Sequence, residues 1–319
     1  MKKDTSWDVI IAGAGPAGLS AALILGRACR RVLICDKGTP RSWAAKHMHA
    51  YLSREGIAPS DFRALGRREV LRQRGVRYLA EEVTSARRVS ETQFEVRIGA
   101  RRYRCRKLLI ATGVLDLLPE IPGFETLFGH TVFQCPYCDG WEIRDRRVAV
   151  YGRRRRGYEM ARAMTAWTRR IELCTDGPSG FSEEEREHLA ANGIRLHEGR
   201  VSRLDGKKNR IEAVVLRDGT RVACEALFFD TPARGQSRLA ESLGCRFARH
   251  GGVLCGQYEA TSVPGVFVAG NVIRDVQLSI VAAAEGARAA FGINRALTRE
   301  DFERRATGSR RVEHPAVSE

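Results

Sequence analysis

The segment that most constrains the fold is the glycine-rich turn Gly13-Ala14-Gly15-Pro16-Ala17-Gly18. It follows the apolar run "WDVIIA", which is typical of a buried parallel strand, and it precedes "LSAALILGRA", which is typical of a helix. A second strand-like run, "RRVLICDKG", contains Asp36, 23 residues after Gly13. A strand, a G-x-G-x-x-G turn, a helix and a strand with an acidic end, in this order, predict a dinucleotide-binding domain.

The three glycines of this turn have separate physical roles. One permits the tight turn, one lets the backbone approach a pyrophosphate, and one lets the helix pack closely on the strand. The start of the helix adds free N–H groups and the positive end of its dipole. A glycine-rich turn without a ligand is the alternative, but the order of the surrounding elements favours a binding site.

The chain repeats this plan in its second half. "RRVAVYG" is a strand, "GYEMARAMTAWTR" a helix and "RIELCTDG" a second strand. "SEEEREHLAANG" is a helix with a Ser182–Glu185 capping box and Gly193 as its stop. Each copy then continues into a meander and a closing strand, the first ending at Ala111-Thr112-Gly113 and the second turning at Asp218-Gly219. The sequence therefore predicts an α/β fold with two Rossmann-like, three-layer ββα dinucleotide-binding domains.

Composition excludes several classes of protein. A length of 319 residues suits two domains of ordinary size, and no run reaches the apolar length of a membrane span. The first residues lack the apolar stretch of a secretory signal, so we expect a cytoplasmic protein. The net charge of +16 comes mainly from arginines spread along the chain, without an aromatic-interleaved basic motif. We therefore expect no nucleic-acid partner, and an acidic protein partner or a merely basic surface remains.

Of the nine cysteines, Cys135 and Cys138 alone form a C-x-x-C pair. The other seven stand apart, mostly in apolar surroundings where a reduced cysteine is an ordinary core residue. A structural zinc site would need a second pair or suitably spaced histidines, so we expect no metal site. The pair itself is typical of a redox-active disulfide at a turn or helix start, where a thiolate pKa is lowered.

Over essentially its full length the chain resembles flavoprotein disulfide reductases of the low-molecular-weight thioredoxin reductase type. The matching stretches are "IAGAGPAG", "LLIATG", "CPYCDGWE" and "TSVPGVFVAGNV" followed by "VQLSIVAAAEGARAA". The resemblance implies a homodimer whose FAD-binding domain comprises residues 1–116 and 246–303, with a second dinucleotide-binding domain at 117–245 inserted into it. Residues 304–319 lack periodicity, and we expect a disordered tail there.

The resemblance also implies a set of FAD-binding residues. Gly13, Gly15 and Gly18 would cradle the pyrophosphate, and Asp36 would accept hydrogen bonds from the adenosine ribose. Asn271 stands where the family has an aspartate that binds the ribityl chain, and its oxygen can still accept from a hydroxyl; it could instead cap a turn. The full expected set is Gly13, Gly15, Pro16, Ala17, Gly18, Asp36, Lys37, Thr112, Gly113, Gly270, Asn271, Gln277 and Leu278.

By the same resemblance, Cys135 and Cys138 are the catalytic disulfide. Cys138 would face the flavin C4a position, Cys135 would attack the substrate disulfide, and Asp139 would protonate the departing thiolate. The same parts could oxidise a dithiol and deliver electrons to another acceptor, so the direction stays open. Arg41, His47 and His49 are expected near the flavin by analogy with the family, without an assigned role.

The second glycine-rich turn departs from the family. It reads Gly152-Arg153-Arg154-Arg155-Arg156-Gly157, so that Arg154 stands where bare backbone should meet a pyrophosphate. Asp176 follows the next strand, where arginines would pair the 2′-phosphate of NADPH and a carboxylate would repel it. NADPH binding of the usual kind is therefore not expected.

Several electron routes and classes of function remain open. The arginines could pair another diphosphate ligand, such as the second FAD of diflavin-linked disulfide oxidoreductases. A small acidic electron-carrier protein or dioxygen could exchange the electrons, as in ferredoxin-linked reductases and dithiol oxidases of this fold. Alternatively, an atypical site could still bind NAD(P)H. The substrate would be a thioredoxin-like protein or a small disulfide or dithiol. A flavin-bound redox sensor or binding module is the alternative that is not an enzyme.

Overall fold

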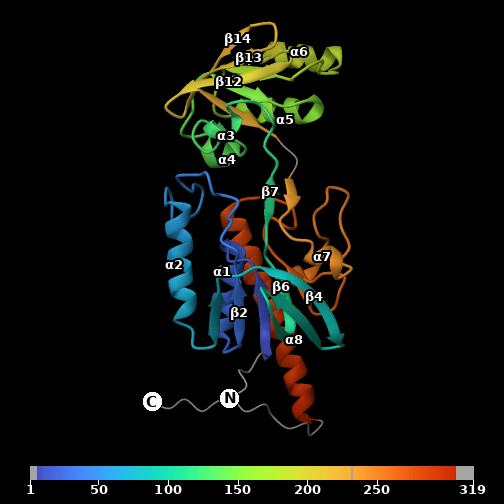
Figure 1. Cartoon of the computed structure of the whole chain (residues 1–319). Coiled ribbons are helices and arrows are strands. Elements are labelled where there is room, and N and C mark those ends of the chain that lie inside the picture. Colours follow the sequence, from blue (N-terminus) through green and yellow to red (C-terminus); the bar gives the residue numbers. More distant parts are fainter. Residues whose placement is uncertain (1–5, 231–232, 307–319) are drawn as a thin grey trace. The chain divides into compact units, whose positions relative to one another are not determined.

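The computed structural model describes residues 6–230 and 233–306, which belong to two compact units (Figure 1). Unit 1 takes its described residues from the segment up to Pro40, from Arg63–Val114 and from Gly235 onward. Unit 2 comprises Arg41–Phe62 and Leu115–Arg234. The chain passes between the units in β7 (Val114–Asp116) and β16 (Ala233–Gly235), two short strands that pair with each other.

The central sheet of unit 1 has seven strands. Its order is β3-β2-β1-β6-β5-β4, and β17 also pairs with β6. β3, β2, β1, β6 and β17 run parallel, whereas β4, β5 and β6 form an antiparallel meander. The strands are β1 (Ser6–Ala12), β2 (Val32–Cys35), β3 (Val76–Leu79), β4 (Val83–Ser90), β5 (Gln93–Ile98), β6 (Arg101–Ile110) and β17 (Val266–Val268).

The helices of unit 1 cover this sheet because both faces of its parallel strands are apolar. Val9 and Ile11 of β1 belong to one core cluster together with α1 and α8, while Ile10 and Ala12 belong to another with the meander. Figure 1 shows α8 beside α1. The helical elements are α1 (Pro16–Arg27), α2 (Pro59–Leu71, which begins in the segment of unit 2), α7 (Leu239–Ser242), the 3-10 turn η1 (Gln257–Glu259) and α8 (Ser279–Ala306).

Unit 2 repeats the plan with a five-stranded parallel sheet of order β11-β10-β9-β15-β8 and a three-stranded meander of order β12-β13-β14. Its strands are β8 (Val132–Phe133), β9 (Val148–Tyr151), β10 (Ile171–Cys174), β11 (Arg195–His197), β12 (Val201–Lys207), β13 (Arg210–Leu216), β14 (Arg221–Ala223) and β15 (Ala226–Phe229). Its helices are α3 (Phe124–Leu127), α4 (Pro136–Asp139), α5 (Arg154–Met164) and α6 (Glu183–Ala191). The α/β fold with Rossmann-type parallel strands is confirmed.

Local signals in the second copy are confirmed as well. The Ser182 hydroxyl accepts from the Glu185 N–H at 3.2 Å, and the Glu185 carboxylate accepts from the Ser182 N–H at 2.9 Å, so the capping box starts α6. Gly193 follows the helix with a φ of +68°. The turn at Asp218-Gly219 joins the antiparallel strands β13 and β14.

Several boundaries differ from the sequence expectation. Residues 41–62, expected in the first domain, belong to unit 2, and the first passage between the units lies at residues 114–115 and not at 116–117. The second passage between the units lies at residues 234–235 and not at 245–246, because α7 and Cys245 pack into the core of unit 1. The last helix, α8, extends to Ala306, so residues 304–306 of the expected tail are helical. The remainder of that tail, residues 307–319, lies outside the described residues.

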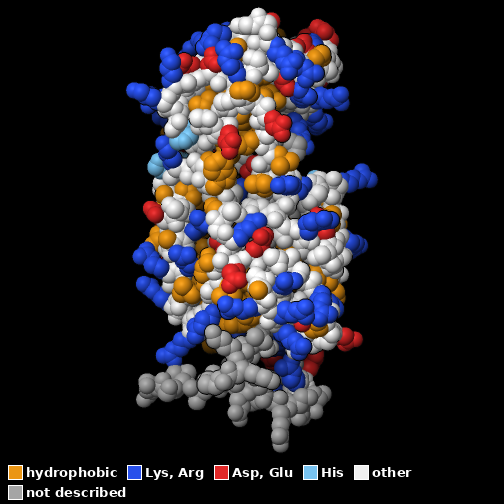
Figure 2. All heavy atoms as spheres, in the orientation of Figure 1, with side chains coloured by type: hydrophobic (Ala, Val, Ile, Leu, Met, Phe, Trp, Pro, Cys, Tyr) orange, Lys and Arg blue, Asp and Glu red, His pale blue; other side chains and the backbone are white. Residues whose placement is uncertain are grey.

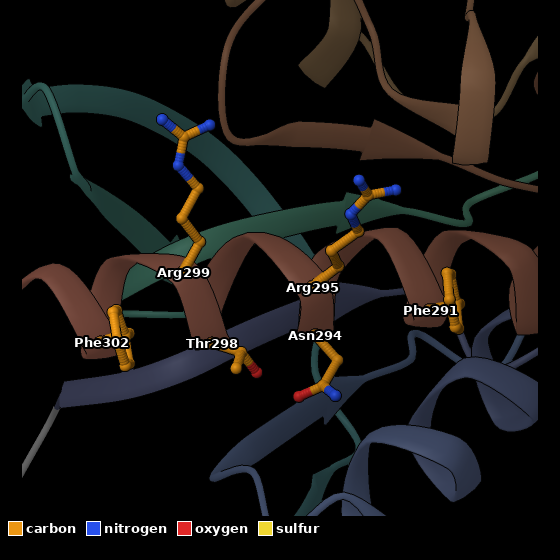
Figure 3. A pocket seen from close by; sticks show the side chains of 6 residues that line it. All are labelled: Phe291, Asn294, Arg295, Thr298, Arg299 and Phe302. Carbon is orange, nitrogen blue, oxygen red and sulfur yellow. The ribbon is translucent and has the colours of Figure 1, made fainter.

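The C-terminal half of α8 has one side tied to the end of α1. Arg30 donates to Asn294 at 2.7 Å and to Thr298 at 2.8 Å, and it pairs with Asp301 at 2.6 Å. Six side chains of α8 line a pocket on this part of the helix (Figure 3). They are Phe291, Asn294, Arg295, Thr298, Arg299 and Phe302. The polar contacts fix this long helix to the Rossmann core of unit 1.

The face of the molecule shown in Figure 2 is basic without one dominant patch. Lys and Arg side chains are spread over the face shown in Figure 2, with acidic side chains among them. In the part of the chain that the structure describes, no helix is long and apolar enough to cross a membrane.

A close contact between α1 and α8 in unit 1 gives a stability test. A Cβ at Gly286 of α8 would lie 2.1 Å from the Ala17 carbonyl oxygen of α1, so Gly286→Ala must push the two helices apart. We expect a loss of about 1–3 kcal/mol in the free energy of unfolding. Gly256→Ala is the control, because no atom lies within 4 Å of the added Cβ. Thermal unfolding followed by circular dichroism measures both, and equal midpoints for the two variants would contradict this packing.

Candidate active site

The cysteines predicted as a redox pair form a disulfide at the start of α4. Cys135 and Cys138 are joined with a Cα–Cα distance of 5.2 Å, and Cys135 caps the short helix by accepting from the Cys138 N–H at 3.1 Å. Pro136 at the first helical position suits this turn. Both cysteines are partly exposed, whereas five of the other seven are buried. The turn formed by residues 135–139 is called the redox turn below.

Cys174, a free cysteine of β10, illustrates the buried thiols. Burial raises the pKa of the Cys174 thiol far above its ordinary range, so it stays protonated and unreactive. Cys35 and Cys105 in unit 1 are shifted in the same direction by burial. The redox turn differs from these buried thiols because both of its sulfur atoms belong to partly exposed residues.

Asp139 is the acid next to the disulfide. Burial raises the pKa of its carboxyl to about 7, the positive charge of His49 opposes this shift, and the negative charge of Glu142 adds to it. Within the described residues, no hydrogen bond joins the Asp139 carboxyl to another group. A carboxyl with a pKa near neutrality can both hold and release a proton in thiol chemistry.

Two aromatic side chains flank the redox turn at the surface. Tyr137, between the cysteines, is 72 % exposed and meets the Trp167 ring edge-on at 5.4 Å. Trp141 is 65 % exposed and stacks with the Arg144 guanidinium at 4.1 Å. These side chains give the surface around the disulfide an apolar character.

The segment at residues 41–62 packs in unit 2, although it follows β2 of unit 1 in sequence. Arg41 makes a two-pronged ion pair with Asp116 at 2.7 Å, and the Trp43 ring lies 5.8 Å from that of Phe128. A Cβ at Gly129 would lie 2.3 Å from the Ala44 carbonyl oxygen, so the backbones are in close contact. The segment therefore brings its own polar side chains to the unit that carries the disulfide.

His49 of this segment lies near Glu142, which follows the redox turn. Its Nδ1 lies 2.6 Å from a Glu55 oxygen, and its Nε2 lies 3.7 Å from a Glu142 oxygen. Glu142 follows Asp139 by three residues. His47 instead faces the Gly56 carbonyl at 3.1 Å. That Arg41, His47 and His49 lie near a flavin stays a prediction.

In unit 1, the first glycine turn has the shape of a phosphate cradle. Gly13 has a φ of +106°, and a Cβ there would lie 2.3 Å from the Ala111 carbonyl oxygen. A Cβ on Gly18 would lie 1.9 Å from the Gly13 carbonyl oxygen, whereas one on Gly15 would meet nothing within 4 Å. Helix α1 begins at Pro16 directly after this open position. The turn fits a dinucleotide pyrophosphate.

Further predicted residues surround the cradle within unit 1. The Thr112 hydroxyl oxygen is buried and lacks a hydrogen-bond partner among the described residues, which suits a ligand contact. Asp36 lies at the end of β2, 4.0 Å from the Arg63 guanidinium. Lys37 pairs with Glu82 at 3.1 Å. The predicted residues are thus brought to one end of the parallel sheet, the end where Rossmann folds bind ligands.

The later predicted residues lie between β17 and α8. Gly270 and Asn271 form a turn, with the Arg274 N–H donating to the Asn271 carbonyl at 3.1 Å. Gln277 and Leu278 precede α8, whose first bond runs from the Ala282 N–H to the Leu278 carbonyl at 2.9 Å. Gln277 and Leu278 therefore lie directly before the first turn of α8.

Sequence reasoning missed Glu285 of α8. Its carboxylate accepts from the Gly270 N–H at 2.6 Å, and burial raises the pKa of Glu285 to about 7. It also missed Glu55 and Glu142, because nothing in the sequence spacing brings residues 49, 55 and 142 together. A glutamate inside the "AAAEGARAA" helix, otherwise small and apolar, was the available signal for Glu285.

In unit 2, the second glycine-rich turn keeps the close contact between its first and last glycine, but the residues between these two glycines are arginines. A Cβ on Gly157 would lie 2.0 Å from the Gly152 carbonyl oxygen, as in the first copy. However, the left-handed residue is now Arg154, with a φ of +50°, and α5 begins at this arginine. The position that is open at Gly15 carries a side chain here.

The arginines of this turn meet acidic side chains of the chain itself. Arg153 forms an ion pair with Asp176, which also accepts from the Tyr151 hydroxyl at 3.2 Å and the Val201 N–H at 2.9 Å. Arg155 lies 3.7 Å from Glu159. Arg156 lies 3.9 Å from Asp230, whose pKa burial raises. Three of the four arginines therefore have acidic partners within the chain, and their pairing with the oxygens of a bound nucleotide stays a prediction.

No metal site accompanies these features. Across residues 6–230 and 233–306, no group of three or more His, Cys, Asp or Glu side chains could hold a metal ion.

Comparison with known proteins agrees with this arrangement. A model of the pyridine nucleotide-disulphide oxidoreductase family matches residues 7–286. The chain is 30% identical over 275 residues to the thioredoxin reductase tcpT of Claviceps purpurea, covering 83% of this chain and 86% of that protein. It is 29% identical over 306 residues to the thioredoxin reductase sirT of Leptosphaeria maculans, which covers 90% of this chain and 93% of that protein.

Solved structures give the same result. The crystal structure of HlmI is 32% identical, with a TM-score of 0.92 over 97% of this chain and 98% of that one. An oxidoreductase from Agrobacterium tumefaciens is 32% identical, with a TM-score of 0.86 over 92% of this chain and 99% of that one. The chain therefore belongs to the pyridine nucleotide-disulphide oxidoreductase family, within which it is a thioredoxin reductase-like enzyme.

Proposed function

We propose that the chain is an FAD-dependent disulfide oxidoreductase that passes two electrons between flavin and an outside disulfide or dithiol through Cys135 and Cys138. The observation that carries this proposal is the disulfide itself, partly exposed and adjacent to an aspartate whose pKa is about 7. The open cradle at Gly15 and the unpaired Thr112 hydroxyl support a flavin dinucleotide in unit 1. FAD, when bound, supplies a two-electron couple that a polypeptide lacks.

The chain's own residues account for the sulfur chemistry. In the reductive direction the Cys135 thiolate attacks one sulfur of the outside disulfide, whose S–S bond breaks. Asp139 gives its proton to the departing thiolate. Cys138 then attacks Cys135, releases the second thiol and restores the disulfide. The protein pair loses two electrons, which the outside disulfide gains.

Recognition of an outside partner would fall to the surface around the redox turn. The relatives named thioredoxin reductases favour a thioredoxin-like protein as the substrate. The exposed Tyr137 and Trp141 would also suit a small apolar disulfide or dithiol. The same exchange run backwards would oxidise a dithiol, with dioxygen as one acceptor.

We further propose that the site at which relatives bind NADPH is degraded in this chain. Arg154 stands at the position where the backbone would approach a pyrophosphate, and the Arg153–Asp176 pair closes the strand end beside it. A carboxylate also repels a 2′-phosphate. These features support a degraded NADPH site, in which a second FAD, a small acidic redox protein or an atypical NAD(P)H complex would take its place.

A comparison of electron donors tests this proposal. Under anaerobic conditions, dithiothreitol should bleach the flavin absorbance of the purified protein, because it enters through the redox turn. NADPH and NADH at about the same concentration should leave the flavin oxidised. Cys138→Ser should abolish bleaching by dithiothreitol.

The outcomes separate the alternatives. Rapid bleaching by low concentrations of NADPH would contradict the degraded site. Release and counting of the bound flavin gives about one per chain for a single site and about two for a second FAD. Failure of dithiothreitol to bleach the wild-type flavin would contradict the redox role of Cys138.

A pH profile tests the role of Asp139. Its raised pKa means that the carboxyl is protonated below about pH 7 and ionised above it, so the donor is lost as pH rises through 7. The rate at which the pre-reduced protein reduces an alkyl disulfide should therefore show a descending limb near pH 7. Asp139→Asn should remove this limb, whereas Asp145→Asn, an exposed aspartate of the same unit, should keep it. A limb that persists in Asp139→Asn would contradict the assignment.

A further inference from the structure

Asp176 places a negative charge where a Rossmann-like unit would receive an anionic ligand. It follows β10, whose carboxyl end lies beside that of β9 in the parallel sheet of unit 2. Ligands of such sheets bind at this end of the strands. The side chain of Asp176 is 13 % exposed, so its charge is largely withdrawn from solvent. A charge withdrawn in this way requires partners within the protein.

Three donors of unit 2 converge on the Asp176 carboxylate. The Arg153 guanidinium forms an ion pair with it and also donates to the Asp176 backbone carbonyl at 3.1 Å. The Tyr151 hydroxyl donates to the carboxylate at 3.2 Å, and the Val201 N–H donates to it at 2.9 Å. A guanidinium, a hydroxyl and a backbone N–H are also the groups with which proteins hold the oxygens of a bound phosphate.

The Tyr151 hydroxyl is kept in its donor form. Burial, and after it the Asp176 carboxylate, raise the pKa of the Tyr151 phenol to about 12. The hydroxyl therefore retains its hydrogen at neutral pH and can donate to any anion that lies beside it.

The backbone of the turn fixes the place of the carboxylate. Asp176 has a φ of +52° and Gly177 a φ of +120°. Aspartate adopts the left-handed conformation more readily than most residues with a side chain. A Cβ on Gly177 would lie 3.2 Å from the Arg200 Nε, so a second guanidinium borders the same turn.

The neighbouring arginines of the run lack this arrangement. Arg155 lies 3.7 Å from Glu159 and Arg156 lies 3.9 Å from Asp230, each in an ion pair at the surface. Exposed pairs of this kind contribute little to stability. Asp176 differs from Glu159 and Asp230 because a strand, a turn and a second strand all donate to it.

We propose that the Asp176 carboxylate occupies an anion site formed by Arg153, Tyr151 and the Val201 N–H, and thereby excludes a phosphate monoester from unit 2. This inference rests on the degraded nucleotide site of the proposed function. It goes further because it leaves the donors intact and assigns the exclusion to one side chain. Loss of that carboxylate opens the site to a phosphate.

Binding of small phosphates to the full chain tests the proposal. Isothermal titration calorimetry, in a buffer free of phosphate and sulfate, compares inorganic phosphate, adenosine 2′-monophosphate and adenosine. Asp176→Gly removes the carboxylate and suits the left-handed backbone. Asp176→Asn removes the charge and keeps the shape. Asp205→Asn is the matched control, because Asp205 of unit 2 also pairs with two arginines, Arg203 at 2.7 Å and Arg221.

Asp176→Gly should bind both phosphates at least about tenfold more tightly than the wild type, because the freed donors form charge-assisted hydrogen bonds. Asp176→Asn should shift the affinity in the same direction by a smaller factor. Asp205→Asn should match the wild type, and the affinity for adenosine should stay unchanged in every variant. Arg153→Ala in the Asp176→Gly background should remove the gain. Tighter binding of adenosine 2′-monophosphate than of inorganic phosphate would assign the opened site to a nucleotide, and the reverse order would assign it to the free ion.

An unchanged affinity for both phosphates in the two Asp176 variants, with circular dichroism and thermal unfolding like those of the wild type, would overturn the proposal. A gain of equal size in Asp205→Asn, or one that persists after Arg153→Ala, would overturn it as well, because net charge alone would then explain the binding. The calorimetry depends on neither flavin reduction nor the disulfide. Its failure is therefore distinct from failure of the proposed function, which the bleaching experiments detect.

Discussion

The close contact between a strand end and the helix that follows it organises both units. Gly18 meets the Gly13 carbonyl in unit 1, and Gly157 meets the Gly152 carbonyl in unit 2, at distances that only glycine permits. This contact sets the angle at which α1 and α5 leave their sheets. The residues between the two glycines are free to change, and in unit 2 they have changed to arginines without loss of the Rossmann plan.

The chemistry depends on a different kind of constraint, the burial of a few acidic groups. Asp139 beside the disulfide and Glu285 beside Gly270 both have pKa values near 7 because burial disfavours their charged forms. Most other carboxylates with a shifted pKa, such as Glu198 beside Arg186 and Ser179, are lowered by hydrogen bonds and stay ionised. Perturbed acids of this kind are common at functional sites.

The sequence predicted the features whose determinants are local. The first glycine turn, the Ser182–Glu185 cap and the C-x-x-C turn each depend on residues a few positions apart, and all three are found. Features that depend on tertiary packing were not predicted. Three such features are the packing of the 41–62 segment in unit 2, the packing of α7 in unit 1 and the Arg153–Asp176 ion pair. Each joins residues whose spacing in the sequence carries no signal.

The most direct test of the central claim, that one disulfide and one flavin form a single redox system, is the number of electrons that the protein accepts. An anaerobic titration with dithionite, followed by flavin absorbance, should require about four electrons per chain for the wild type and about two for Cys138→Ser. A wild type that is fully bleached by about two electrons would contradict the claim, because the disulfide would then be isolated from the flavin.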